Sequence, residues 1–129
     1  MIDERLQGVS DKLKLGAIKR HIFLCADQTK PKCASREDGL EVWDYLKKRI
    51  DELGLSDCGV FRSKANCLRV CLQGPIAVVY PEGIWYHSVD IPAIERIIQE
   101  HLVNGRVVRE FLLAEPYIPV SNGKCSSIS

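Results

Sequence analysis

Four cysteines in two pairs are the residues of this sequence best suited to chemistry. Cys25 and Cys33 form the first pair, and Cys67 and Cys71 form the second pair much further along the chain. Four thiolates are the ligand set of a zinc site or of an iron–sulfur cluster. Zinc sites usually place two to four residues between paired cysteines, whereas seven residues separate Cys25 from Cys33. This wide first pair favours a cluster, and zinc is the alternative.

The other two cysteines are expected to lie outside such a site. Cys58 falls at the start of a predicted strand, roughly 15 Å from the ligand end at about 3.3 Å per residue. We therefore expect Cys58 to be a small buried core residue. Cys125 lies in the C-terminal tail, where we expect an exposed free thiol.

Length, charge and composition limit the class of protein. The 129 residues indicate one domain, and a formal net charge of +1 gives no reason to expect nucleic acid or membrane binding. The opening segment is acidic and polar, without the apolar core of a secretory signal, and no apolar run approaches the roughly 18 residues of a membrane span. We therefore expect a cytoplasmic protein, in which six cysteines favour metal ligation over disulfides.

Apolar periodicity and turn residues divide the chain into strands and helices. A compact apolar run at residues 21–25 predicts a buried strand. Ser35, with Asp38 three residues later, predicts a capped helix that ends at Gly54. Further predicted elements are strands at 58–62, 76–80 and 84–87, a hairpin turn at 81–83, a second helix from Asp90 to Asn104-Gly105, and a short strand or arm at 106–114.

This order of elements would bring the two cysteine pairs together. A strand–helix–strand unit usually leaves its strands parallel in one sheet, and parallel strands end at the same edge. Cys25 closes the first strand, and Cys67 and Cys71 lie in the loop that leaves the second. Both ligand loops should therefore emerge on one side, where α/β sheets generally bind their ligands.

We expect the aromatic residues of the sequence, and His101, to have structural roles. Trp43 lies on the apolar stripe of the first helix, which predicts a core position. Trp85 and Tyr86 are adjacent on a strand, so one of the two should point into the core. His101, near a helix end, is expected to interact with the terminal carbonyls.

The second cysteine pair and the stretch after it resemble a known family. The runs CLRVC (67–71) and GPIAVVYPEGIWY (74–86) look like those of the thioredoxin-like 2Fe-2S ferredoxins, and the strand with Cys25 and its wider pairing to Cys33 match the first half of the pattern. The resemblance covers roughly residues 20–103. It implies an α/β protein with a thioredoxin-like, mixed four-stranded sheet, two main helices, and a Pro75 preceded by a cis peptide bond.

The resemblance also implies a cofactor and a domain organisation. It implies one 2Fe-2S cluster, with Cys25, Cys33, Cys67 and Cys71 as its ligands. It also implies one-electron transfer with redox partner proteins and a homodimer. All-cysteine ligation favours a low reduction potential, on the order of −400 mV. The expected parts are an N-terminal extension (1–19), a ferredoxin domain (20–114) and a loosely ordered tail (115–129).

A small electron-transfer protein, not an enzyme, is the expected function. The sequence has no phosphate-binding loop, no dinucleotide fingerprint and no nucleophile elbow. The alternatives are an electron-transfer subunit of a larger oxidoreductase, an iron–sulfur sensor, and a structural zinc-binding protein. The cations near the ligands suggest either a collar that docks an acidic redox partner or simple compensation of an anionic cluster; they are Lys30, Lys32, Arg36, Arg62, Lys64 and Arg69.

Overall fold

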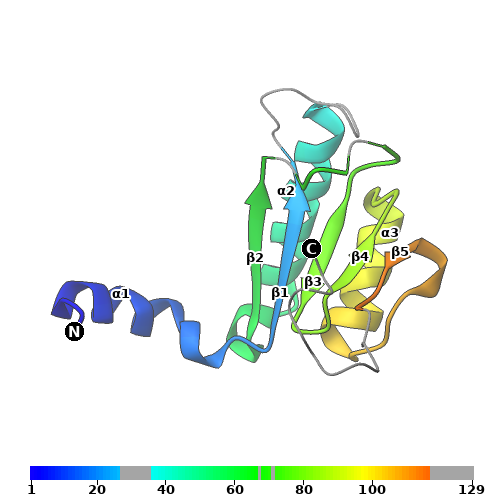
Figure 1. Ribbon diagram of the computed structural model, residues 1–129. Helices are drawn as coiled ribbons and strands as arrows, with labels where there is room; N and C mark the ends of the chain where they lie inside the picture. Colours follow the sequence, from blue (N-terminus) through cyan, green and yellow to red (C-terminus); the bar gives the residue numbers. More distant parts are fainter. Residues whose placement is uncertain (27–35, 67, 71, 117–129) are drawn as a thin grey trace, which may run out of the picture.

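A five-stranded mixed sheet organises the chain (Figure 1). The computed structural model describes residues 1–26, 36–66, 68–70 and 72–116. The strands are β1 (Arg20–Cys25), β2 (Val60–Ala65), β3 (Ala77–Tyr80), β4 (Ile84–Tyr86) and β5 (Leu112–Ala114). The helices are α1 (Glu4–Leu13), α2 (Arg36–Glu52) and α3 (Ile91–Arg96), which continues as the π-helical segment η3 (Ile97–Val103). Short 3₁₀ segments are η1 (Leu15–Ala17), η2 (Leu55–Cys58) and η4 (Arg109–Phe111).

The strand order is β2-β1-β3-β4-β5, with β1 and β2 parallel and the other neighbours antiparallel. The parallel pair on either side of α2 and the hairpin between β3 and β4 confirm the predicted connections. The expectation of four strands is wrong, because β5 pairs with the outer edge of β4. Three residues are too few to show the alternating pattern by which a strand is recognised.

Both main helices begin or end close to the predicted residues. Gly54, at φ +63°, follows α2, and the left-handed conformation there favours glycine. Asp90 caps α3, because its Oδ1 accepts a hydrogen bond of 3.0 Å from the Ala93 backbone N–H. Ser35, the predicted cap of α2, lies outside the described residues.

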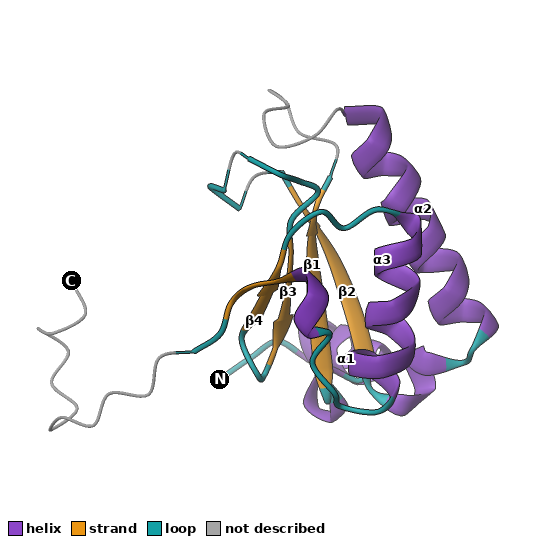
Figure 2. Cartoon of the chain, turned by 90° about the vertical axis from the view of Figure 1, so that its right-hand side faces the viewer, coloured by secondary structure: helices purple, strands orange, loops and turns teal. Residues whose placement is uncertain are grey.

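The hydrophobic core fills the space between the sheet and the two helices, which cover one face of the sheet (Figure 2). Alternation along β1 turns Ile22 and Leu24 into this core, where both are fully buried. The helices contribute an apolar stripe, which on α2 departs from the periodic pattern because Val42 is buried whereas Trp43 is only partly buried. Its buried members are Val42, Leu46 and Ile50 of α2 and Ile94, Ile97, Ile98 and Leu102 of α3 and η3.

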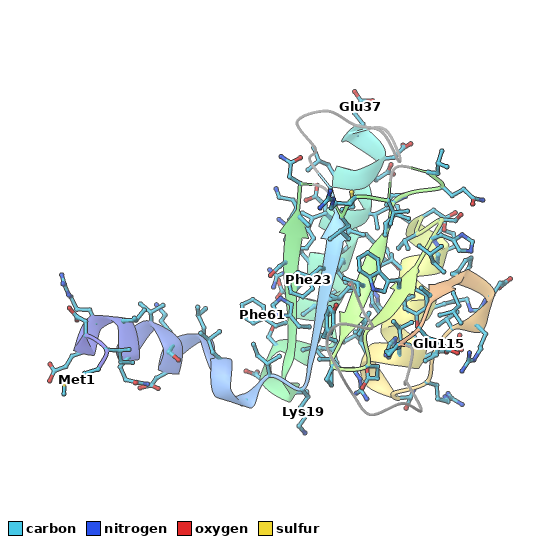
Figure 3. The ribbon with its side chains drawn as sticks, viewed as in Figure 1. Met1, Lys19, Phe23, Glu37, Phe61 and Glu115 are labelled. Atoms are coloured by element: carbon cyan, nitrogen blue, oxygen red, sulfur yellow. The ribbon has the colours of Figure 1, made fainter. Side chains whose placement is uncertain are left out.

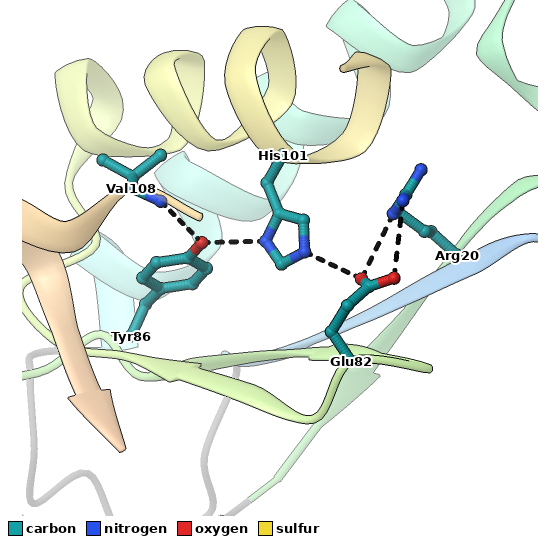
Figure 4. Close-up of polar contacts among 5 residues, drawn as sticks. All are labelled: Arg20, Glu82, Tyr86, His101 and Val108. Atoms are coloured by element: carbon teal, nitrogen blue, oxygen red, sulfur yellow. Dashed lines mark hydrogen bonds and ion pairs between the residues drawn. The ribbon is translucent and has the colours of Figure 1, made fainter. Parts of the chain in front are cut away.

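His101 departs from its predicted role. It is fully buried, and its ring bonds side chains rather than helix-terminal carbonyls: Nδ1 lies 2.8 Å from the Tyr86 hydroxyl and Nε2 lies 2.8 Å from Glu82 Oε1 (Figure 4). The reason is that η3 turns His101 toward the sheet, where β4 offers a buried hydroxyl. Tyr86 is thus the core member of the Trp85–Tyr86 pair, which confirms that one of the two points inward.

The N-terminal helix α1 projects away from the sheet beside the β2 edge (Figure 1). None of its residues is buried, and Leu6, Val9 and Leu13 expose about half of their surface along one stripe. Asp3 caps the helix by accepting a 2.7 Å hydrogen bond from the Arg5 N–H. Among the described residues no helix is both long and apolar enough to cross a membrane.

Candidate functional site

Cys25 is the last residue of β1 and lies at one end of the sheet. Only 1% of its surface is exposed. Its backbone N–H donates a 2.9 Å hydrogen bond to the Ile76 carbonyl, and its Sγ lies 4.0 Å from the Asn66 carbonyl oxygen. The thiol is therefore held at the point where the chain leaves β2 and where it enters β3.

The parallel pairing of β1 with β2 sets the position of the second cysteine loop. Cys25 lies opposite Ala65 in the register, and the Ala26 N–H donates a 2.9 Å hydrogen bond to the Ala65 carbonyl. The chain then passes through Asn66 directly into Cys67. The predicted meeting of the two strand ends is thus confirmed. Of the four expected ligands, only Cys25 is described; Cys33, Cys67 and Cys71 lie outside the described residues.

The far end of the same loop is fixed to the start of the second helical region. The Gln73 carbonyl accepts a 2.7 Å hydrogen bond from the Ser88 N–H, and the Pro75 carbonyl accepts one of 2.9 Å from the Val89 N–H. The Gly74-Pro75 peptide bond is cis, as the resemblance implied. Both described ends of this loop are therefore anchored by backbone hydrogen bonds.

Arg69 occupies the middle of the three-residue spacer between Cys67 and Cys71. Its φ is +70°, a left-handed conformation that is uncommon for residues other than glycine. A left-handed residue reverses the local direction of the chain, which is what a short loop needs in order to return two side chains to one point. This conformation could not be predicted from the residue type, because arginine is not typical of such turns.

Gly39 is a site residue that the sequence reasoning missed. It lies in the first turns of α2, where a Cβ would come within 3.2 Å of the Ala26 Cα and 3.4 Å of the Cys25 carbonyl oxygen. The absence of a side chain lets the helix approach the end of β1 closely. A glycine inside an otherwise helical pattern was the available signal.

Cys58 is exposed, and the expectation that it is buried is wrong. It lies in η2 rather than in the strand, because Gly59 at φ +87° makes a turn before β2 begins at Val60. A Cβ on Gly59 would lie 2.7 Å from the Ala17 carbonyl oxygen, so the close approach of that segment requires glycine. Cys58 remains at the end of β2 opposite to Asn66, which is consistent with a residue outside the ligand set.

Of the predicted cations, Arg62 and Lys64 lie on β2, Arg69 lies in the loop after it, and Arg36 begins α2. Lys64 and Arg69 are exposed, while the guanidinium carbon of Arg62 lies 5.8 Å from the centre of the Trp43 ring. Trp43 is therefore only half-buried, packed against the core with a cation on its outer side, rather than fully inside as predicted. Lys30 and Lys32 lie outside the described residues.

Two curated relatives of this chain are 2Fe-2S ferredoxins. A 2Fe-2S ferredoxin from Clostridium pasteurianum is 35% identical over 96 residues, which cover 70% of this chain and 92% of the relative. A 2Fe-2S ferredoxin from Aquifex aeolicus is 27% identical over 101 residues, covering 74% of this chain and 90% of the relative. No protein-family model matches the chain.

A solved structure shares the fold. The thioredoxin-like 2Fe-2S ferredoxin from Aquifex aeolicus superimposes with a TM-score of 0.69 at 24% identity, covering 81% of this chain and 99% of the other. The mixed sheet with its helices on one face is therefore thioredoxin-like. Together with the 35% identity over nearly the whole Clostridium relative, the findings show that this chain belongs to the 2Fe-2S ferredoxin family.

Proposed function

We propose that this protein is a small one-electron carrier that holds one 2Fe-2S cluster through Cys25, Cys33, Cys67 and Cys71. The observation that carries the proposal is the register of β1 and β2, which places the Cys25 thiol beside the residue that precedes Cys67. The names of the relatives, which are 2Fe-2S ferredoxins, support the cluster over zinc. When bound, such a cluster supplies a centre that gains and releases a single electron.

The described residues fit an all-thiolate group at this end of the sheet. Cys25 is buried and carried on a strand, so its thiol has one defined position and little access to water. Gly39 brings α2 against the same strand end, and the anchored ends of the 66–75 loop limit where the second cysteine pair can go. The contribution of the described residues is thus to hold the Cys25 thiol in place and to shield it from solvent.

The experiment compares serine variants of the cysteines. Cys25→Ser and Cys67→Ser are expected to lose the visible absorption and the near-equal iron and acid-labile sulfide of protein purified without oxygen. Cys58→Ser is the matched control, and it should keep both, because Cys58 is exposed at the opposite end of β2. Colourless wild-type protein that contains zinc and is fully folded would contradict the proposal, as would a Cys67→Ser variant with an unchanged spectrum.

We also propose that two copies associate through the sheet face that α2 and α3 leave uncovered. Phe23 and Phe61 project from this face (Figure 3), and the His21 ring stacks on both at centroid distances of 4.1 and 4.8 Å. Tyr80 continues the row and is 45% exposed. We call the row His21, Phe23, Phe61 and Tyr80 the aromatic face. Its aromatic content is typical of protein interfaces, which supports a homodimer.

The proposal also covers the cellular location, the partners and the domain bounds of the protein. We propose that it acts in the cytoplasm, exchanges electrons with redox partner proteins and transforms no organic substrate itself. The reducing conditions of that compartment suit a chain whose cysteines serve as ligands. We also keep residues 20–114 as the ferredoxin domain, since the sheet begins at Arg20 and its last strand ends at Ala114.

A further inference from the structure

We propose that a basic cleft between the end of α1 and the free edge of β2 binds an acidic, extended peptide segment of a partner protein. The cleft has a volume of about 350 Å³, within the range of ligand pockets. It lies at the start of β2, whereas the predicted ligand Cys67 follows the end of that strand. The proposal therefore goes beyond the proposed function, because it assigns a second site away from the cysteine end.

A backbone hydrogen bond at Gly59 joins the two walls of the cleft. Residues 12–14 and 17–19 form one wall, and residues 56–62 form the other. The Gly59 carbonyl accepts a hydrogen bond of 2.7 Å from the Lys19 N–H. The start of β2 is thus held against the segment that leads from α1 into β1 (Figure 1). The cleft is part of the packed chain, although α1 itself projects away from the sheet.

The second wall includes the open edge of the sheet, because β2 is an edge strand. The carbonyls of Gly59, just before β2, and of Ala65, its last residue, both accept hydrogen bonds from the β1 side. Every second residue of a strand turns its N–H and C=O toward the same neighbour, so the even-numbered residues of β2 turn theirs to the open edge. Arg62 is one of these and lines the cleft. Such edge groups bind an extended peptide as an added strand.

Apolar side chains line both walls of the cleft. Leu13 contributes from α1 and Phe61 from β2. Figure 3 shows Phe61 on the side of β2 that faces α1. Successive side chains of an added strand point to opposite sides, so every second residue of the bound peptide would contact these two. The peptide should therefore alternate apolar residues with polar ones.

The charge of the lining selects acidic residues for the polar positions. Of the described residues that line the cleft, four are cations and one is an acid: Lys12, Lys14, Lys19, Arg62 and Asp57. The acid is already paired, since Lys14 Nζ lies 3.4 Å from Asp57 Oδ1. The whole chain has a formal charge of only +1, so positive charge is concentrated at this cleft. It favours a ligand that carries carboxylates.

A peptide bound here would tether a partner without covering the cysteine end. β2 has six residues and so spans about 20 Å at about 3.3 Å per residue. A partner held through a short segment stays at a high effective concentration beside the far end of the sheet. Exposed ion pairs are individually weak, so the tether can release. This role rests on the proposed function, whereas the binding itself does not.

The test uses full-length protein purified without oxygen and a labelled hexapeptide of alternating glutamate and valine, with binding measured by fluorescence anisotropy. The acidic peptide should bind at low salt, and a hexapeptide of alternating lysine and valine should not. Two acidic peptides, N-methylated at the glutamate or at the valine amides, should differ in affinity, because only alternate amides pair with a strand edge. Binding should also slow alkylation of Cys58, an exposed thiol that lines the cleft, measured by mass spectrometry.

Matched variants separate the charges from the apolar contact. Lys12→Glu should weaken binding about fivefold at low salt, and high salt should remove the difference. Lys48→Glu, an exposed change on α2 outside the cleft, should stay within about twofold of wild type. Leu13→Ser should weaken binding several-fold at both salt concentrations, whereas Leu6→Ser, similarly exposed on the same helix, should not. All four variants keep Phe61, which also belongs to the aromatic face.

Three results would overturn the strand-binding cleft. They are equal affinity of wild type for the acidic and basic peptides, equal effects of Lys12→Glu and Lys48→Glu, and affinity that neither pattern of N-methylation changes. Competition by glutarate at the same concentrations as by unlabelled peptide would show a site for small anions and would also overturn the proposal. Colourless wild-type protein that still binds the acidic peptide would overturn the proposed function alone.

Discussion

The Tyr86 hydroxyl oxygen lies 2.8 Å from Nδ1 of His101, and neither side chain is exposed. The Val108 backbone N–H donates a 3.1 Å hydrogen bond to that hydroxyl, which leaves the tyrosine proton for Nδ1. His101 Nε2 then carries the ring proton and donates it to Glu82, whose carboxylate also pairs with Arg20 (Figure 4). The network is therefore satisfied with His101 neutral, and it ties the start of β1 and the turn after β3 to β4 and η3.

Removing the Tyr86 hydroxyl should weaken the fold measurably. In Tyr86→Phe the Val108 N–H and His101 Nδ1 both lose their partner inside the core, where an unsatisfied polar group costs about 1–3 kcal/mol. We expect a decrease of that size in the free energy of unfolding, measured by urea titration with circular dichroism.

Tyr45→Phe is the matched control for this change. Tyr45 also loses one hydroxyl hydrogen bond, of 2.8 Å to Glu95 Oε1, but its side chain is only half-buried, so water can replace the lost partner. Its cost should be clearly smaller than that of Tyr86→Phe. An equal decrease in the free energy of unfolding in the two variants would show that burial does not make the Tyr86 hydrogen bonds more stabilising than the Tyr45 hydrogen bond.

The same network should make stability fall at mildly acidic pH. Burial lowers the pKa of His101 below its ordinary value of 6.5, although the bond to Glu82 opposes the shift. The unfolded chain therefore takes up a proton first as the pH drops, so the stabilising contribution is complete above about pH 6.5 and declines below it. The free energy of unfolding, measured from about pH 7 down to pH 5, should decrease less steeply in His101→Gln than in wild type.

The titration of a second histidine, His21, has to be distinguished from that of His101. Burial also lowers the pKa of His21, which titrates in the same direction. His21→Gln should therefore flatten the curve as well, and the double variant should flatten it further. If His101→Gln and wild type had parallel curves, the neutral state assigned to His101 would be wrong.

Gly39 links the helix to the ligand-bearing end of β1, so a larger residue there should disturb the site first. Gly39→Val places methyl groups where a Cβ alone already approaches the Ala26 Cα to 3.2 Å. We expect a loss of about 1–3 kcal/mol in stability, the usual cost of overpacking, and a reduced iron content per protein. Gly8→Ala in α1 is the control, because nothing lies within 4 Å of the added carbon. Full iron content in Gly39→Val would contradict a positioning role for this glycine.

Much of the fold could be predicted because its elements carry strong local signals. Alternation in β1, the helical stripe ending at Gly54 and the Asp90 cap all correspond to described structure. The segment 106–114 is predicted only as a short strand or arm, because the pairing of three residues with the edge of β4 depends on tertiary contacts. His101 was misassigned because its partners, Tyr86 and Glu82, are brought to it by tertiary packing that sequence spacing does not reveal.

The candidate site was predictable where it depends on topology. The crossover through α2 dictates that β1 and β2 end together, so the place of Cys25 beside Asn66 followed from the order of elements. The positive φ of Arg69 and the close approach at Gly39 depend on loop paths and helix distance, which no residue pattern encoded. Cys58 is misplaced in the prediction because β2 begins two residues later than expected, at Val60, since strand boundaries are the least certain part of such a prediction.

The proposed homodimer can be tested at Phe61 on the aromatic face. In a two-fold symmetric pair each substitution counts twice, and burying a phenylalanine contributes about 1.5–3 kcal/mol per copy. Phe61→Glu should therefore weaken association by about a thousandfold, measured by sedimentation equilibrium with circular dichroism as a check of folding. Val103→Glu, an equally drastic change at an exposed apolar residue on the helical side, should leave the dimer intact. A monomeric wild type, or equal dissociation of both variants, would remove the aromatic face as the interface, because only a contact centred on β1 and β2 predicts that difference.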